Sequence, residues 1–184
     1  MARIIGIAGS LRKGSYNAAL LRAAAAAAPA GLEVEIASIA GIPLYDGDLE
    51  EEHGAPAQVV ALQEAIAASD GLLIVTPEYN ASIPGVLKNA IDWLSRPPMG
   101  AAKVFGDRPV AIIGATPGAW GTRLSQTALL PVFRNLGARV YLGKQLYVAA
   151  ASKVFDGDGA MGDDKVRKQL SEFMAGFATF VALR

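Results

Sequence analysis

Apolar runs typical of strands alternate along the chain with longer segments whose apolar residues recur every three or four positions, as in helices. The expected strands cover residues 3–9, 32–38, 71–75, 109–115 and 140–148. The expected helices cover residues 17–28, 57–69, about 84–93, 123–136 and 164–183. There is no internal repeat and no break in composition. The pattern therefore predicts one α/β domain over residues 1–184.

The predicted strands differ in how much of each should be buried. Leu72–Val75 is apolar at every position, which is typical of a strand buried on both faces of a parallel sheet. In the second strand Glu33 and Glu35 alternate with apolar residues, so one face of that strand should meet solvent. The segment 41–56 carries a cluster of acids and is predicted to be a long loop.

Polar and aromatic residues follow the third predicted strand where it ends. The apolar run stops at Thr76–Pro77, and Glu78–Asn80 follow no regular period. A helix comes next with Pro84 near its first turn, and four of its residues should share one face: Val86, Leu87, Ala90 and Trp93. Open α/β sheets bind ligands beyond the carboxyl ends of their strands. A loop with aromatic and amide groups at this place could hold a flat heterocycle through stacking and main-chain hydrogen bonds.

A second loop of the same kind follows the first predicted strand. Residues 9–17 bring glycines, two serines, an asparagine and the cations Arg12 and Lys13 to the start of a helix. Free backbone N–H groups and the positive end of the helix dipole favour a phosphate at such a position. The spacing is neither the dinucleotide Gly-x-Gly-x-x-Gly pattern nor a Walker P-loop. The loop is therefore predicted to suit a terminal monophosphate better than a bridging pyrophosphate.

Taken together, the two loops resemble those of the NADPH-dependent FMN reductase family, which belongs to the flavodoxin-like flavoproteins. That family carries Gly-Ser-x-Arg-x-x-Ser-x-Asn after its first strand, matched here by Gly9, Ser10, Arg12, Ser15 and Asn17. It also carries Pro-Glu-Tyr-Asn, Pro-Gly and Lys-Asn-x-Ile-Asp-Trp, matched by residues 77–80, 84–85 and 88–93. The order and spacing agree over most of the chain. The loop Thr116–Thr122 departs from the pattern, since the family more often has serine and paired glycines there.

The resemblance implies a flavodoxin-like three-layer sandwich, with a five-stranded parallel sheet of order 2-1-3-4-5 and helices on both faces. It implies FMN as cofactor and NADPH or NADH as co-substrate. The acceptors typical of the family are quinones, azo dyes, free flavin and chromate, and ping-pong hydride transfer would need no catalytic side chain. The residues it places around FMN are Ser10, Arg12, Ser15, Tyr16, Asn17, Pro77, Glu78, Tyr79, Asn80, Thr116, Pro117 and Gly118. Some members build each flavin site from two chains, so a homodimer or homotetramer is expected.

Several of these residues also have a structural interpretation. Ser15 or Asn17 could serve as the N-cap of the first helix. Tyr16 could lie beside the flavin or support the loop, and Glu78 could bond loop amides or a partner subunit. Trp120, in a glycine-flanked loop, could lie near the flavin ring or the nicotinamide.

Four further residues are weaker candidates for a role in the site. Ser82 and Lys88 are more simply explained as surface capping residues, and Trp93 as a core or interface residue. His53, the only histidine, stands beside three glutamates and is predicted to be an exposed loop residue. That run of acids could in principle hold a metal ion, but adjacent acids usually form a solvated face. No metal site is predicted.

Composition narrows the class of protein. A chain of 184 residues, of which 52% are apolar, is long enough for one buried core. Lys plus Arg equal Asp plus Glu at 17 each, which gives no electrostatic case for binding nucleic acid or an anionic membrane. The absence of cysteine excludes disulfides, thiolate nucleophiles and zinc–thiolate sites. With no expected signal peptide and no apolar run long enough to span a membrane, a cytoplasmic protein is expected.

Two other functions remain open from the sequence. A flavodoxin-type electron carrier would bind FMN without oxidising NAD(P)H. Flavodoxins are usually strongly acidic, whereas this chain is formally neutral. A plain Rossmann-type NAD-binding module is disfavoured because the Gly-x-Gly-x-x-Gly pattern is missing.

Overall fold

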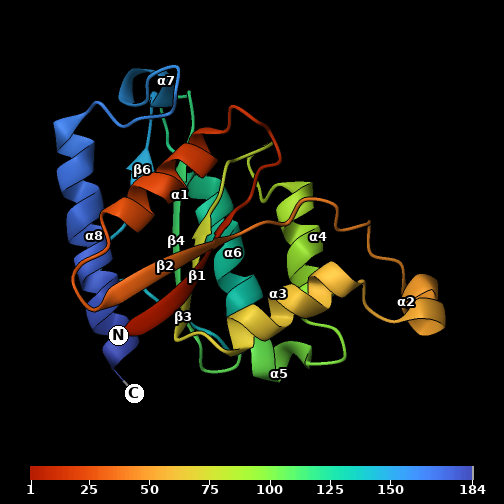
Figure 1. The fold of residues 1–184 in the computed structure, drawn as a ribbon. Helices are drawn as coiled ribbons and strands as arrows, with labels where there is room; N and C mark the ends of the chain where they lie inside the picture. The colour runs from red at the N-terminus through yellow and green to blue at the C-terminus, as the bar shows by residue number, and fades with distance from the viewer. Residues whose placement is uncertain (184) are drawn as a thin grey trace.

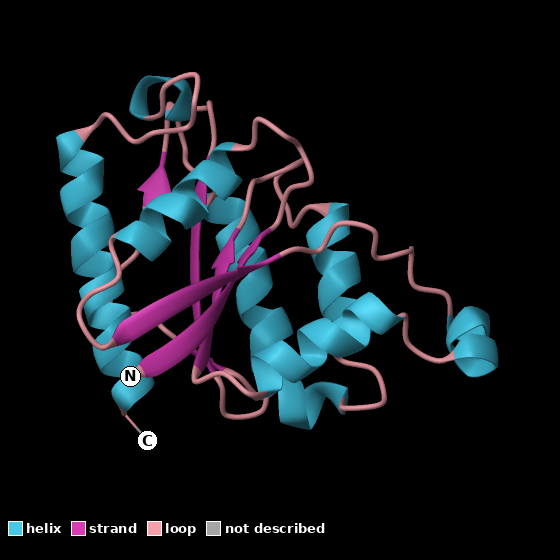
Figure 2. Ribbon diagram, viewed as in Figure 1, coloured by secondary structure: helices cyan, strands magenta, loops and turns pink. Residues whose placement is uncertain are grey.

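The computed structural model describes residues 1–183 as a parallel sheet with helices on both faces (Figures 1 and 2). The strands are β1 (Ala2–Ala8), β2 (Leu32–Ala37), β3 (Gly71–Val75), β4 (Pro109–Ala115), β5 (Arg139–Val140) and β6 (Tyr147–Val148). Their order is β2-β1-β3-β4-β5, and β6 also pairs with β4. All pairings between these strands are parallel. The predicted strand order is confirmed.

Two layers of helices enclose this sheet. The longer helices are α1 (Tyr16–Ala26), α3 (Ala57–Ala67), α4 (Gly85–Leu94), α6 (Arg123–Asn135) and α8 (Asp164–Ala182). The shorter ones are α2 (Gly47–His53), α5 (Gly100–Val104) and α7 (Ala151–Val154). Helices α1 and α8 cover one face of the sheet, and α3, α4, α5 and α6 cover the other. No helix within residues 1–183 is both long and apolar enough to cross a membrane.

The central strands are buried because both of their faces meet helices. Every residue of β3 and of β4 is buried. Successive side chains of a strand point to opposite faces, so Leu73 joins the core under α1 and α8 while Leu72 joins the core under α3 and α4. The near-continuous apolar run in these strands thus reflects two cores that share one sheet.

The predicted long loop 41–56 contains a helix, so that prediction was wrong for residues 47–53. Asp46 caps α2, its side chain accepting a hydrogen bond from the backbone N–H of Asp48 at 2.9 Å. Gly54 ends the helix with a positive φ of 72°. The acids that looked like a solvated loop are therefore helical. The short helices α5 and α7 were also not expected.

The fifth predicted strand, residues 140–148, is broken into β5 and β6. Both pieces pair with β4, and the backbone N–H of Tyr141 still donates to the carbonyl of Val110 at 2.8 Å, but residues 142–146 form no strand between them. The ring of Tyr141 packs against three phenylalanines of α8, with centroid separations of 5.5–5.8 Å: Phe173, Phe177 and Phe180. Tyr141 is thus the last residue of the first piece that bonds β4, and its ring is fixed by distant residues of α8 that periodicity alone does not reveal.

One side chain of α4 was assigned to the wrong face. Leu87, Ala90 and Trp93 are buried as predicted, whereas Val86 is exposed. Consecutive helical residues are about 100° apart, and Val86 falls outside the stripe that faces the sheet.

Candidate active site

Three loops lie together at the carboxyl edge of the sheet: the first loop (residues 9–15), the second (76–84) and the third (116–122). They follow β1, β3 and β4, which are neighbours in the sheet (Figure 1). The backbone N–H of Gly9 donates to the carbonyl of Val75 at 2.8 Å. A β-carbon on Gly9 would lie 2.8 Å from Leu87 Cδ2, so the first loop passes close to α4.

The first loop presents unused hydrogen-bond donors at the start of α1. Ser15 is the N-cap, and its hydroxyl accepts from the backbone N–H groups of Asn17 and Ala18. The first turn of α1 has no acid, so the positive end of this helix keeps its charge. Within residues 1–183, neither the Arg12 guanidinium nor the N–H groups of Lys13 and Gly14 meet an acceptor. These residues fit a bound phosphate.

Asn17 has a different task from the rest of its motif. It is only 3% exposed, its amide N–H donates to the carbonyl of Ala115 at 2.9 Å, and its carbonyl accepts from the Ala115 N–H at 2.8 Å. Ser15, not Asn17, therefore caps α1. Asn17 joins α1 to the end of β4 and thereby holds the first and third loops in register. One N–H of the Asn17 side-chain amide is not used by these bonds, and it is the group that could donate to a phosphate.

Tyr16 supports the first loop from the side of α7. Its ring stacks on that of Phe155, with centroids 6.1 Å apart. A hollow of about 210 Å³ lies beside it, and Lys13, Ser15 and Arg22 are among its lining residues. A second hollow, of about 300 Å³, lies between the first loop, α1 and the end of β2, and Ser10 is among its lining residues. The first loop is thus open on both sides.

The second loop is a tight turn at its tip. The backbones of Tyr79 and Ser82 bond each other in both directions, at 3.2 and 3.1 Å, and Asn80 and Ala81 between them have positive φ angles of 50° and 60°. Asparagine tolerates this conformation better than most residues. Pro77 is buried, whereas the Tyr79 side chain is 45% exposed. The turn therefore holds an aromatic ring at the surface of the carboxyl edge.

Glu78 joins the second loop to α6. Its carboxylate accepts from the backbone N–H groups of Leu124 and Ser125 at 2.8 and 3.2 Å. The hydroxyl of the buried Thr76 adds a 3.0 Å hydrogen bond to that of Ser125. The structural interpretation of Glu78 holds in an altered form: the amides it bonds belong to the first turn of α6 and not to a loop, and its carboxylate neutralises the N-terminus of that helix.

Replacing Glu78 with alanine should lower the free energy of unfolding by about 1–2 kcal/mol, because α6 loses its cap. For a chain of this length the melting temperature should fall by about 2–8 °C. Glu78→Gln keeps an acceptor oxygen and should lose less. Thermal unfolding followed by circular dichroism measures the effect, and Glu64→Ala on the exposed side of α3 is the matched control. Equal melting temperatures for both alanine variants would contradict the capping role.

The third loop is held to β6 and to the residues just after that strand. The N–H of Thr116 donates to Val148 at 2.9 Å, and the carbonyl of Gly118 accepts from Ala150 at 2.9 Å. Pro117 and Gly118 are exposed, and Trp120 is 77% exposed. The loop therefore places a second aromatic side chain at the carboxyl edge.

The remaining candidates lie outside the loops or serve them indirectly. Lys88 pairs with Asp92 one helical turn away at 2.7 Å, and Ser82 closes the turn described above. Trp93 is a core residue. His53 is exposed at the end of α2, next to Glu52. Of these four residues only Ser82 belongs to one of the three loops, and it is the backbone of Ser82 that closes the turn there.

Sequence reasoning missed the residues at the junction of the second and third loops. A β-carbon on Gly114 would lie 2.1 Å from both the carbonyl oxygen of Thr76 and the hydroxyl of Thr122, so only glycine fits there. Thr76, Thr122 and Ser125 are fully buried polar residues. Thr76 is far from Gly114 and Thr122 in the sequence, and the three form no regular pattern, so no local signal indicated this junction.

The chain is similar to known flavin enzymes over most of its length. It is 42% identical over 170 residues to an NAD(P)H-dependent FMN reductase of Pseudomonas aeruginosa, covering 92% of this chain and 90% of that protein. It is 40% identical over 179 residues to a 2-hydroxy-1,4-benzoquinone reductase of a Burkholderia species, covering 97% and 96%.

The solved structure of FerB, a flavoenzyme NAD(P)H:(acceptor) oxidoreductase from Paracoccus denitrificans, has the same fold. It superposes with a TM-score of 0.87 at 33% identity, covering 99% of this chain and 98% of that one. The model of one family matches residues 2–153. With this match over most of its length and two relatives at about 40% identity, the chain belongs to the NADPH-dependent FMN reductase family.

Proposed function

We propose that the chain, acting as one flavin-binding domain, is an FMN-dependent NAD(P)H oxidoreductase that reduces quinone-type acceptors. The observation that carries the proposal is the open, positively charged start of α1, where the Arg12 guanidinium and the backbone N–H groups of Lys13 and Gly14 lack acceptors within residues 1–183. Free donors at a helix N-terminus suit the phosphate of FMN. The family and the named relatives support the same cofactor and reaction.

Each loop has a separate task in this proposal. The first loop binds the phosphate through Ser10, Arg12 and Ser15. The second and third loops orient the ring with main-chain groups and with the exposed aromatic side chains of Tyr79 and Trp120. The chemistry that bound FMN would supply is redox chemistry: it would take a hydride from the nicotinamide and reduce the acceptor. Glu78 is committed to the N-terminus of α6, so it positions the loops and serves as no acid or base.

We also propose the range of acceptors, the oligomeric state and the cellular location of the enzyme. Free flavin, azo dyes and chromate join quinones as candidate acceptors, because the aromatic side chains that would lie beside a bound flavin, Tyr79 and Trp120, are exposed to solvent and leave room for oxidants of several shapes. A homodimer or homotetramer is proposed, and the exposed leucines Leu44 and Leu49 between β2 and α3 support it. A chain without cysteine suits the reducing cytoplasm, which is the proposed location.

Anaerobic addition of NADPH or NADH to the purified yellow protein should bleach the flavin absorbance within seconds. The alternative, a flavodoxin-type carrier, would stay yellow under the same conditions. A protein that cannot be loaded with FMN would contradict both functions. Absorbance spectroscopy under nitrogen distinguishes the three results.

The steady-state kinetics of the enzyme should be ping-pong. Nucleotide and quinone use one exposed ring face in turn, so double-reciprocal plots at several quinone concentrations should be parallel. Intersecting lines would mean that both substrates bind together, and the shared face would then be wrong.

A further inference from the structure

Of the residues that line the hollow of about 300 Å³ beside the first loop, only Ser10 is assigned to FMN. The hollow lies where the carboxyl ends of β1 and β2 meet α1. Three of its lining residues are alanines, one from each of these elements: Ala8, Ala18 and Ala37. Because their side chains end at the β-carbon, they leave a space at the lower end of the range for small-molecule sites, which begins at about 300 Å³.

Two exposed aliphatic side chains line this hollow. Leu11 of the first loop is 51% exposed, and Ile36 of the edge strand β2 is 49% exposed. Aliphatic surface that is left in water is stabilised when a flat ring packs on it. The Ser38 hydroxyl accepts from the Ala40 N–H at 3.1 Å, and its own proton meets no acceptor within residues 1–183. The hollow therefore suits a heterocycle with polar atoms.

Arg22 of α1 brings a positive charge to the same hollow. It lines this hollow and also the hollow of about 210 Å³ beside Tyr16. The Arg22 side chain is exposed, and its guanidinium forms no hydrogen bond and no ion pair with residues 1–183. The neighbouring Asp156 carboxylate accepts instead from the backbone N–H groups of Asp158 and Ala160. Arg22 is therefore available to bind an anion.

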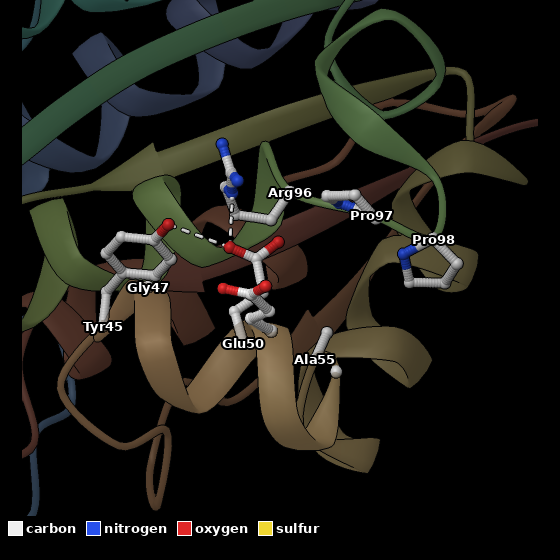
Figure 3. A pocket seen from close by; sticks show the side chains of 9 residues that line it. Tyr45, Gly47, Glu50, Ala55, Arg96, Pro97 and Pro98 are labelled. Carbon is white, nitrogen blue, oxygen red and sulfur yellow. Dashed lines mark hydrogen bonds and ion pairs between the residues drawn. The ribbon is translucent and has the colours of Figure 1, made fainter.

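A hollow of about 490 Å³ next to α2 suits an anion less well (Figure 3). Its arginine, Arg96, donates to the Glu50 carboxylate at 2.8 Å, and the Tyr45 hydroxyl donates to the same carboxylate. The bond from Arg96 lowers the pKa of Glu50, so this carboxylate is charged. Glu51 lines the hollow as well, and the two acids together outweigh the one arginine.

We propose that the hollow of about 300 Å³ binds the adenosine half of NAD(P)H, with the adenine between Leu11 and Ile36 and a phosphate on Arg22. This rests on the function proposed above and names the place where the co-substrate is held. Ser10 belongs both to the hollow and to the loop that is assigned to the FMN phosphate. The adenosine half would therefore lie beside that phosphate, and the nicotinamide half is left to meet the flavin ring.

Adenosine 5′-diphosphate (ADP) is a redox-inactive probe of this site, because it carries the adenine, ribose and phosphates of the nucleotide and no nicotinamide. Isothermal titration calorimetry should show that ADP binds to the FMN-loaded wild type. Arg22→Ala and Ile36→Glu should each weaken ADP binding by about tenfold. The first variant loses a charge-assisted hydrogen bond, and the second replaces an apolar contact with a charge of the same sign as the phosphates.

Two exposed residues elsewhere supply the matched controls: Arg134→Ala on α6 and Leu183→Glu at the C-cap of α8. Both should bind ADP like the wild type. All four variants should keep the FMN content of the wild type, because the replaced side chains are exposed in the protomer.

Anaerobic bleaching of the flavin separates the adenosine half of the nucleotide from its reacting half. For Arg22→Ala and Ile36→Glu, the NADPH concentration that gives the half-maximal bleaching rate should rise by about tenfold, while the rate at saturating NADPH stays close to that of the wild type. Reduced nicotinamide mononucleotide lacks the adenosine half. It should therefore bleach these variants and the wild type at the same concentrations.

The possible results distinguish this site from the function on which it rests. If NADPH bleaches the wild type but ADP does not bind to it, the adenosine site is wrong and the proposed function stands. If neither NADPH nor NADH bleaches the wild type, the proposed function is wrong. ADP binding that is unchanged in both Arg22→Ala and Ile36→Glu would overturn the adenosine site. Loss of FMN from either variant would place the replaced residue in the flavin site and would overturn it too.

Discussion

Arg12→Ala is expected to weaken FMN binding by about ten- to a hundredfold. The guanidinium stands exposed at the start of α1 without a partner within residues 1–183, and a charge-assisted bond to a phosphate contributes about 1.5–3 kcal/mol. Riboflavin lacks the phosphate, so its affinity should stay nearly unchanged. Titration of the apoprotein with each flavin, followed by quenching of flavin fluorescence, measures both constants.

Lys13→Ala is the matched control for this experiment. Lys13 is an exposed cation of the same loop, and the loss of one screened charge should weaken FMN binding by about fivefold at most. An equal loss of FMN and riboflavin affinity in the Arg12 variant would mean that Arg12 contacts the flavin ring or stabilises the fold, and does not bind the phosphate. If the wild type does not bind FMN more tightly than riboflavin, the assignment of a phosphate site to the first loop is wrong.

Gly114→Ala should be the most damaging single substitution around the site. The new β-carbon would lie 2.1 Å from the Thr76 carbonyl oxygen, a main-chain atom that cannot rotate away, and equally close to the Thr122 hydroxyl. Overpacking of this kind costs about 3 kcal/mol. The melting temperature should therefore fall by about 6–12 °C. FMN affinity should fall as well, because the second and third loops are forced apart.

Gly85→Ala supplies the comparison for that variant. A β-carbon at Gly85, in the first turn of α4, would meet no atom within 4 Å. Alanine there should leave the melting temperature unchanged or raise it slightly, because alanine restricts the unfolded chain. If both glycine variants unfold at the wild-type temperature, the close approach at Gly114 is not a constraint on the loops.

The sequence by itself determined the order of elements and the chemistry of the loops. β4 was predicted at 109–115 and observed at Pro109–Ala115, because an apolar run between a turn and a polar loop is a local signal. The motifs in the first and second loops identified the family for the same reason. Their residues are close in sequence, and the fold brings the two loops to one edge through the strand order.

Tertiary structure alone decided what several of those residues do. Asn17 bonds Ala115 across 98 positions, and Glu78 bonds Leu124 across 46. No local pattern records such a pairing. The Tyr141 ring packs against aromatic residues of α8, and the Asn89 and Trp93 side chains of the second motif donate hydrogen bonds to the carbonyl of Pro43. Periodicity reports which face of an element is apolar, but the partner of a buried polar group depends on which distant segment the fold places against it.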